Sequence, residues 1–445
     1  MDYNDLPENP RERVLAIRRM LAEHKGFFPN AGNLGQFCYR SQTIQLHRTR
    51  ANEFRQAIED RNFAAIREDL EVIFHEITHW ADTIGTLWGQ RHLRYVFSAY
   101  EVVLNNYPEQ TYERVVALHD AERRLRYPDY YRFVHNTPTR ATVETPWRIA
   151  WTVGHEFDAY GRINRQHPII FVRLSDHGTG EEAIRQPLTV GSLLETSAMW
   201  SEMRTGLEAF ALLDPIQAAI DKRLHSEKMK EYLYNPNVTE YTAPAHMLSV
   251  LCQIGEVYST YEHAAMLIQI ALNLPQKYVC KLSVSGAPPS VLTALRNRGE
   301  PGFIFAALCE AAPKSSPDAD VSEWVENVLT ACGLPCREKI LGEAKAELSN
   351  VYNAMKKKKT FPLVEHLYDV GISILAARSS ERDPSVTLYM AEKTGITLPP
   401  MFDSEGEILL LTDRCPDFNI LDPHEMYDAE AKLHTWLINF LAACR

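Results

Sequence analysis

One stretch of this 445-residue chain, residues 71–90, reads EVIFHEITHWADTIGTLWGQ and has the pattern of a largely buried helix. Apolar residues recur there at helical spacing around most of the helix surface: Val72, Ile73, Phe74, Ile77, Trp80, Ala81, Ile84 and Leu87. Four polar residues fall at i, i+4, i+7 and i+11 and so form one stripe: His75, His79, Asp82 and Thr86. Burying such groups without partners costs on the order of several kcal/mol. We therefore predict a helix over about 66–90 whose polar stripe has a role other than packing.

The stripe contains His75-Glu76-Ile77-Thr78-His79, a match to the pattern H-E-x-x-H. Two imidazoles one helical turn apart point the same way and can bind one zinc ion. Glu76 lies beside them and can accept a proton from a water molecule that the metal activates. The pattern is short and the chain has 16 His, so a chance match is on the order of a few per cent. The buried helical context favours a site for one Zn²⁺ per chain.

Composition narrows the class of protein. Apolar residues make up 45% and charged residues 24% of the chain, as in an ordinary globular protein. The 47 Lys and Arg against 58 Asp and Glu give a net charge of −11, which argues against general binding to nucleic acid or to an anionic membrane. The sequence contains no run of 18 apolar residues, so no membrane span is expected. The first residues have no signal-peptide core and the eight Cys are scattered, so we expect a cytoplasmic protein with reduced thiols.

The rest of the chain predicts a mainly α fold with a small β-sheet (α+β). Three stretches have strand character: 37–48, a hairpin at about 147–176, and 406–413. Helical spacing returns at about 192–213 and 246–274, and residues 290–445 read mainly as short helices. We expect two regions: 1–275 with the motif helix and the hairpin, and a mainly helical region 276–445 of unknown role.

A catalytic zinc needs a third protein ligand and an open position for water. Glu195 and Glu202 share one face of the helix predicted at 192–213, since they are seven residues apart. Ser192 with Glu195 also matches a capping box, in which Glu195 only caps its own helix. The other candidate ligands are His155, His177, Glu202 and Glu208.

Two stretches, about 70–90 and 191–205, together resemble the zincin superfamily of metallopeptidases, specifically its gluzincin branch. In that branch a Glu on a later helix completes the site, often within E-G-x-A-x-x-x-E. Glu195-Thr196-Ser197-Ala198 followed by Glu202 looks like this pattern, with Thr196 where Gly is common. The metzincin pattern fails, because Asp82 stands where its Gly would be and Gly85 where its third His would be.

The resemblance implies a zincin-like catalytic core and a zinc-dependent peptidase that acts on a peptide or protein. Zinc would be held by His75, His79 and Glu195, with Glu76 as general base. Asp82 and Glu202 are candidates for carboxylates that hydrogen-bond to the ligands and orient them without binding the metal.

Two further features of zincins have several candidates in this chain. An edge strand that binds extended substrate would be 42–48 or the 147–176 hairpin. Four residues are available to stabilise an oxyanion: Tyr160, His225, Tyr258 and Tyr261. The alternative to an enzyme is a helical protein-interaction module with a structural or vestigial metal site, for which a closed shell of four ligands is expected.

Overall fold

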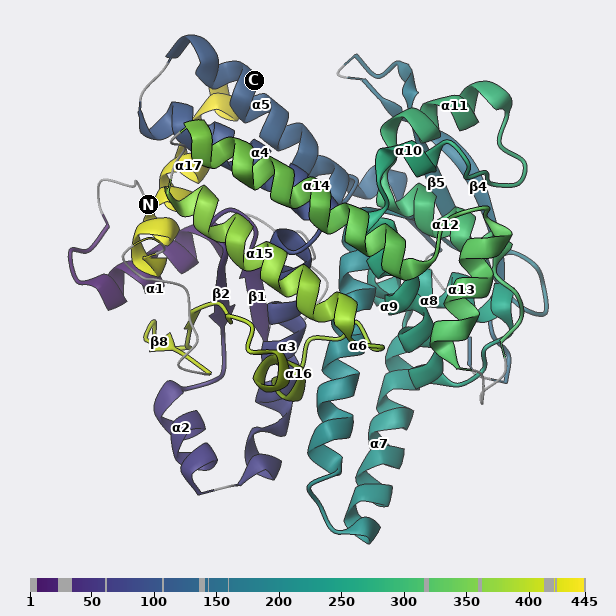
Figure 1. Cartoon of the computed structure of the whole chain (residues 1–445), viewed down its shortest axis with the longest axis horizontal. Helices are drawn as coiled ribbons and strands as arrows, with labels where there is room; N and C mark the ends of the chain where they lie inside the picture. The colour runs from purple at the N-terminus through teal and green to yellow at the C-terminus, as the bar shows by residue number, and fades with distance from the viewer. Residues whose placement is uncertain are drawn as a thin grey trace.

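The computed structural model of the chain describes residues 6–22, 34–60, 62–105, 108–135, 141–142, 144–158, 160–315, 320–358, 362–411, 420 and 422–443. Helices dominate these residues, and two small sheets lie among them (Figure 1). The predicted mainly α fold with little β-structure is confirmed, and the β-structure forms two sheets rather than one.

The elements of the first half run from the N-terminal helix α1 to α6 and α7, the two helices that extend to the bottom of Figure 1. They are α1 (Pro10–Ala22), β1 (Gly35–Cys38), β2 (Thr43–Leu46), α2 (Ala51–Glu59), α3 (Phe63–Ile84), α4 (Leu87–Leu104), α5 (Pro108–Leu125), the 3₁₀ helix η2 (Asp129–Tyr131), β3 (Phe133–Val134), β4 (Arg148–Phe157), β5 (Ile163–Ser175), β6 (Glu182–Pro187), α6 (Val190–Phe210) and α7 (Pro215–Leu233).

The elements of the second half are again mostly helices. They are η3 (Pro236–Val238), α8 (Thr239–Cys252), α9 (Val257–Asn273), α10 (Gln276–Val279), α11 (Pro289–Arg298), α12 (Pro301–Ala311), α13 (Val321–Ala331), α14 (Arg337–Lys358), α15 (Pro362–Ser380), α16 (Leu388–Thr394), β7 (Met401–Phe402), β8 (Ile408–Leu409) and α17 (Pro423–Ala443).

The first sheet has the strand order β1-β2-β7-β8 and joins the two ends of the chain. β1 and β2 are antiparallel, whereas β2 pairs in parallel with β7, with Ile44 opposite Met401. The prediction of 42–48 as an edge strand is therefore wrong, because β2 has a partner on each side. β1 is the strand at this edge. Of the strand predicted at 406–413 only Ile408–Leu409 forms, and residues 412–413 lie outside the described part.

The second sheet, with the order β3-β6-β5-β4, contains the predicted hairpin. β4 and β5 pair from Arg148 opposite Ser175 to Phe157 opposite Ile163, with an irregular register between His155 and Glu156. The hairpin prediction at 147–176 is confirmed.

Helix α3 carries the H-E-x-x-H motif but ends earlier than predicted. The helix ends at Ile84. Thr86 then caps the next helix, α4, by accepting a hydrogen bond from the Gly89 backbone N–H. Thr86 is therefore not part of the polar stripe. A side chain at Gly85 would lie 2.9 Å from Ile374 Cγ2 on α15. Glycine here allows α15 to approach α3.

Helix α6 begins at Val190, two residues before Ser192, the predicted capping residue. Thr189 is the N-cap, and the reciprocal capping bonds join Thr189 to Ser192. The expected capping box of Ser192 with Glu195 is thus wrong. Because the cap is complete without it, the Glu195 side chain is available for contacts with α3.

Three of the C-terminal helices are longer than the sequence pattern suggests. α14, α15 and α17 have 22, 19 and 21 residues, so the prediction of mainly short helices over 290–445 holds only for α11, α12, α13 and α16, which have 10, 11, 11 and 7 residues. The helical region predicted at 246–274 is also interrupted, because Gln253 adopts a left-handed conformation that ends α8. α14 and α15 lie side by side across the front of the molecule (Figure 1).

A boundary near residue 275 stays a prediction, and contacts of several kinds cross it. One cluster of buried apolar residues extends from Phe37 to Leu437. β7 pairs with β2, and α15 packs on α3. Residues after 275 therefore take part in the surroundings of the motif helix.

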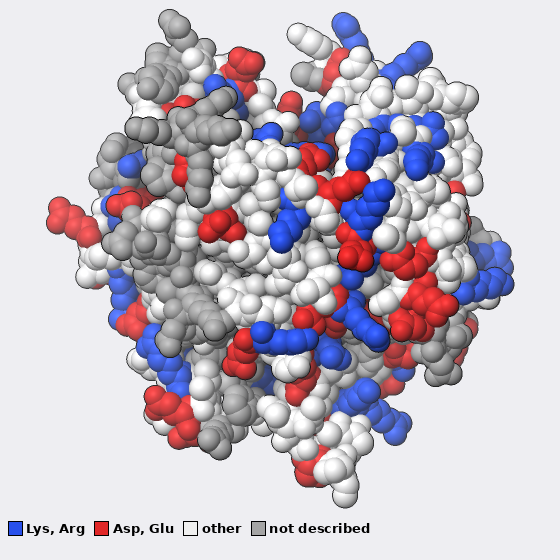
Figure 2. Space-filling model, viewed as in Figure 1, with Lys and Arg blue, Asp and Glu red and all other residues white. Residues whose placement is uncertain are grey.

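Surface and sequence features bear on possible partners. None of the described helices is long and apolar enough to cross a membrane. On the face drawn in Figure 2, Lys and Arg are interspersed with Asp and Glu over the coloured residues. The six cysteines within the described residues are free thiols, and Cys415 and Cys444 lie outside them. The cytoplasmic location stays a prediction.

Candidate metal centre

Helices α3 and α6 pack side by side and bring three predicted ligands together. Nε2 of His75 lies 3.2 Å from one carboxylate oxygen of Glu195, and Nε2 of His79 lies 3.3 Å from the other. The ligand atoms of the three residues all lie within 4.8 Å of one another. In the described part of the chain this is the only group of three or more His, Cys, Asp or Glu with that property.

The separations fit a zinc site. Tetrahedral zinc with bonds of about 2.0–2.1 Å places its ligand atoms roughly 3.3 Å apart. The two His–Glu195 separations are close to that value, and both imidazoles present the same nitrogen to the centre. The side chains of His75, His79 and Glu195 are only 13%, 5% and 4% exposed. The residues present therefore suit a buried three-ligand zinc site.

Glu202 lies behind His75, as expected of a carboxylate outside the metal shell. Its Oε2 is 3.0 Å from Nδ1 of His75, the nitrogen that faces away from Glu195. A ligating His commonly donates its other N–H to a carboxylate, which fixes the ring and its tautomer. The contact suits that role for Glu202 and removes it from the candidates for third ligand.

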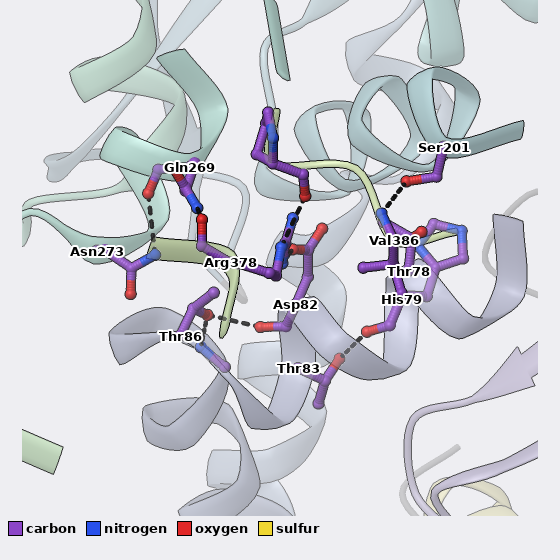
Figure 3. A network of polar contacts seen from close by, with 12 residues as sticks. Thr78, His79, Asp82, Thr83, Thr86, Ser201, Gln269, Asn273, Arg378 and Val386 are labelled. Atoms are coloured by element: carbon purple, nitrogen blue, oxygen red, sulfur yellow. Dashed lines mark hydrogen bonds and ion pairs between the residues drawn. The ribbon is translucent and has the colours of Figure 1, made fainter. Parts of the chain in front are cut away.

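Asp82 contacts a different residue from the one predicted. Its Oδ1 accepts a hydrogen bond of 2.5 Å from Nη1 of Arg378, as Figure 3 shows. Nδ1 of His79 and Oδ2 of Asp82 are buried, and neither has a hydrogen-bond partner among the residues that the structure describes. A direct bond from Asp82 to a metal-binding His stays a prediction.

Glu76 lies beneath β1, at the edge of the first sheet. The Glu76 residue is 8% exposed, and the Phe37 backbone N–H donates a hydrogen bond to its carboxylate. A Cβ atom at Gly35 would lie 3.0 Å from Glu76 Cγ and 3.3 Å from Glu76 Oε1. The absence of a side chain at Gly35 thus lets the strand lie directly on the carboxylate.

The centre brings carboxylates and imidazoles into direct contact. Burial raises the pKa of Glu76, and the neighbouring imidazoles only partly offset this. Burial alone would lower the pKa of His75, yet hydrogen bonds to Glu195 and Glu202 raise it well above its usual value. Burial would raise the pKa of Glu195, but the charge of His79 and hydrogen bonds from both imidazoles lower it to about 2. The ligand atoms of His75, His79 and Glu195 in this set could hold a metal ion.

The remaining candidate ligands lie elsewhere. His155 is on β4 opposite Pro168, and His177 is exposed in the turn after β5. Glu208 accepts a hydrogen bond from Thr387. None of the three belongs to the group of ligand atoms formed by described residues.

Two tyrosines near the centre were not predicted. The Tyr39 ring is 6.3 Å from the His79 ring, and burial followed by the charges of Glu195 and Glu76 raises the pKa of Tyr39. Burial and the Glu195 charge likewise raise the pKa of Tyr241. Both phenols therefore stay protonated donors. No local pattern distinguishes them in the sequence.

The tyrosines and the histidine predicted as oxyanion donors have other surroundings. Tyr160 is 83% exposed near the turn between β4 and β5. Tyr261 packs in an apolar cluster with Met199 and Trp200. Tyr258 and His225 contact each other, at 2.9 Å between Oη and Nδ1.

Glu71, another buried carboxylate, lies one turn before His75 on α3. Oε1 of Glu71 is 3.5 Å from Nε of Arg67 and 3.8 Å from Nε2 of His225. Burial, followed by the charge of Glu202, raises the pKa of Glu71 to about 7. Glu71 is thus a protonated or half-protonated group at neutral pH.

Comparison of the chain with protein-family models, curated proteins and solved structures found no match. The likeness to gluzincins accordingly remains one of two short sequence motifs, now seen on adjacent helices.

Proposed function

We propose that the protein is a zinc-dependent peptidase whose centre is formed by His75, His79 and Glu195. The observation that carries the proposal is the convergence of both Nε2 atoms on one buried carboxylate at 3.2 and 3.3 Å. When bound in such a site, zinc supplies Lewis acidity toward a carbonyl oxygen and toward water.

Glu76 is the general base of the proposed reaction. It accepts a proton from the attacking water and later delivers that proton to the leaving amine. Its raised pKa suits both transfers, because a carboxylate with a pKa nearer neutrality is a stronger base toward the water and is still acidic enough to return the proton to the amine. Tyr39 and Tyr241 are candidate donors to the developing oxyanion, since their phenols remain protonated.

Edge strand β1 supports an extended peptide as substrate. Within the described residues it pairs only with β2, and Phe37 directs its backbone N–H toward Glu76. A peptide added to this edge would run past the general base.

The alternative, an interaction module with a structural metal, requires a different ligand set. A structural zinc site is normally closed by four protein ligands. The group formed by described residues has three, which supports a site with a position left for water and substrate.

The experiment that tests the proposal is Glu76→Gln with zinc content and hydrolysis measured on the same sample. A denatured protein or a peptide library serves as substrate, with products identified by mass spectrometry. We expect zinc to be retained and hydrolysis to fall by at least about 10²-fold, the scale of general acid–base catalysis. Undiminished hydrolysis in the variant would refute the mechanism. Absence of zinc and of hydrolysis in the wild type would favour the interaction module.

A further inference from the structure

Residues 378–387, which lead from the end of α15 to the N-cap of α16, contact both helices that carry the predicted ligands. On the α3 side, Nη1 of Arg378 donates to Oδ1 of Asp82 at 2.5 Å. The two side chains are only 3% and 1% exposed. Asp82 is three residues beyond His79, so this ion pair fixes the end of α3 nearest the metal-binding imidazole (Figure 3).

The same segment holds α6 at several points around Glu202. Three hydrogen bonds make these contacts: Trp200 Nε1 to Asp383 Oδ1 at 2.8 Å, Val386 N to Ser201 Oγ at 3.0 Å, and Thr387 Oγ1 to Glu208 Oε1 at 3.0 Å. An ion pair of 3.3 Å between Arg204 and Asp383 adds a fourth. The segment therefore follows the face of α6 that lies against the C-terminal half.

The segment is itself held in shape. Nε of Arg378 donates to the Pro384 carbonyl at 2.8 Å, which closes residues 378–384 into a loop. Nη2 of Arg337 donates to the carbonyls of Arg378 and Glu381 at 3.2 and 3.1 Å. The backbone of this loop is thus anchored on α14 before it reaches the ligand helices.

The position of this loop matters for metal binding, because the proposed ligands come from two separate helices. His75 and His79 move with α3, whereas Glu195 moves with α6. A zinc site tolerates deviations of about 0.2 Å in its bond lengths. Relative sliding of the helices by even part of a helical rise, roughly 1.5 Å per residue, would separate Glu195 from the imidazoles.

We propose that residues 378–387 form a clasp that sets the spacing of α3 and α6, and that Arg378 is a positioning residue for the zinc centre. The proposal rests on the proposed function, since it assigns a role toward that zinc site. It gives the C-terminal half a part in metal binding, although none of its described residues belongs to the ligand group.

The test compares zinc affinity in Arg378→Gln, Arg378→Lys and wild type, by chelator competition on folded protein. Arg123→Gln is the control, because Arg123 pairs α5 with the buried Glu156 of β4, and within the described residues no hydrogen bond or ion pair joins Arg123 to α3, α6 or the clasp. We expect Arg378→Gln to bind zinc at least about tenfold more weakly, within the 10–100-fold range of groups that orient ligands. Arg378→Lys, which keeps the charge, should recover part of that loss, and Arg123→Gln should bind zinc as wild type does.

A spectroscopic measurement separates positioning from loss of stability. The visible spectrum of the Co²⁺-loaded protein reports ligand geometry, and it should change in Arg378→Gln but not in Arg123→Gln. If Arg378→Gln does not fold, Asp383→Asn gives the same test from the α6 side, because the Asp383 side chain is 27% exposed. Wild-type zinc affinity and spectrum in the variants, or an equal loss in Arg123→Gln, would overturn the clasp. Failure of wild type to bind zinc would instead refute the proposed function.

Discussion

Substitution of Gly35 by Ala tests how closely β1 lies on Glu76, the proposed general base. The added Cβ would be 2.8 Å from Val72 Cγ1 and 3.0 Å from Glu76 Cγ, distances at which side chains must move. Overpacking of this kind costs about 1–3 kcal/mol. For a chain of 445 residues, an unfolding entropy of about 2 cal/mol/K per residue turns this cost into a fall in Tm of roughly 1–3 °C.

The same substitution at Gly342 is the matched control. Gly342 is exposed within helix α14, and a Cβ there meets no atom within 4 Å. Ala should therefore stabilise the helix by roughly 0.5–1 kcal/mol, so the two variants move Tm in opposite directions.

The assay is calorimetry together with hydrolysis and zinc content. Because the nearest side chains to the new Cβ are Val72 and Glu76, Gly35→Ala should keep its zinc and lose about tenfold or more in hydrolysis, as a displaced catalytic group does. A Gly35→Ala variant as stable and as active as wild type would refute the close packing of β1 on Glu76.

Three further predictions concern single side chains of the centre and its surroundings. Glu195→Ala removes one of the three proposed ligands and should weaken zinc binding by about 10²–10⁴-fold, which corresponds to roughly a third of the 10–16 kcal/mol typical of zinc sites. Chelator competition measures this, and unchanged affinity would move the third ligand to another residue. Glu71→Gln tests the pKa of about 7 for the Glu71 carboxyl. The folded state holds the Glu71 proton more tightly than the unfolded chain does, so wild type loses up to about 3 kcal/mol of stability as pH rises from 4.5 to 7. In chelator, the variant should match wild type near pH 4.5 and exceed it at pH 8, and parallel pH profiles would contradict the assignment. Tyr39→Phe should keep zinc but slow hydrolysis by about tenfold or more if this phenol serves the oxyanion, and unchanged kcat would leave that role to Tyr241.

The parts of the candidate site that sequence could predict are those fixed by helical spacing. His75 and His79 are one turn apart, and Glu195 and Glu202 share one face of α6, so each pair follows from the chain itself. The structure adds that these two faces meet, with Glu202 on the outer nitrogen of His75.

The parts that sequence could not predict depend on contacts between distant residues. Helix α3 ends at Ile84, next to the point where α15 packs against Gly85, and no local pattern indicates that approach. β7 has only two residues, too few for a recognisable alternation, and it is defined by its partner β2. Arg378 looks like any arginine near a helix end until its partner Asp82 is seen across 296 residues of chain.

The parallel pairing of β2 with β7 has a consequence for synthesis on the ribosome. The three predicted ligands have all been made once residue 195 is added, but Met401 and Phe402, which complete the sheet beside Glu76, follow about 200 residues later. At roughly 5–20 residues per second this interval lasts about 10–40 seconds. During that time the nascent chain exposes the second edge of β2 and the ligand helices without their later partners. Chaperone contacts and premature metal uptake during translation are therefore expected to concentrate in this window.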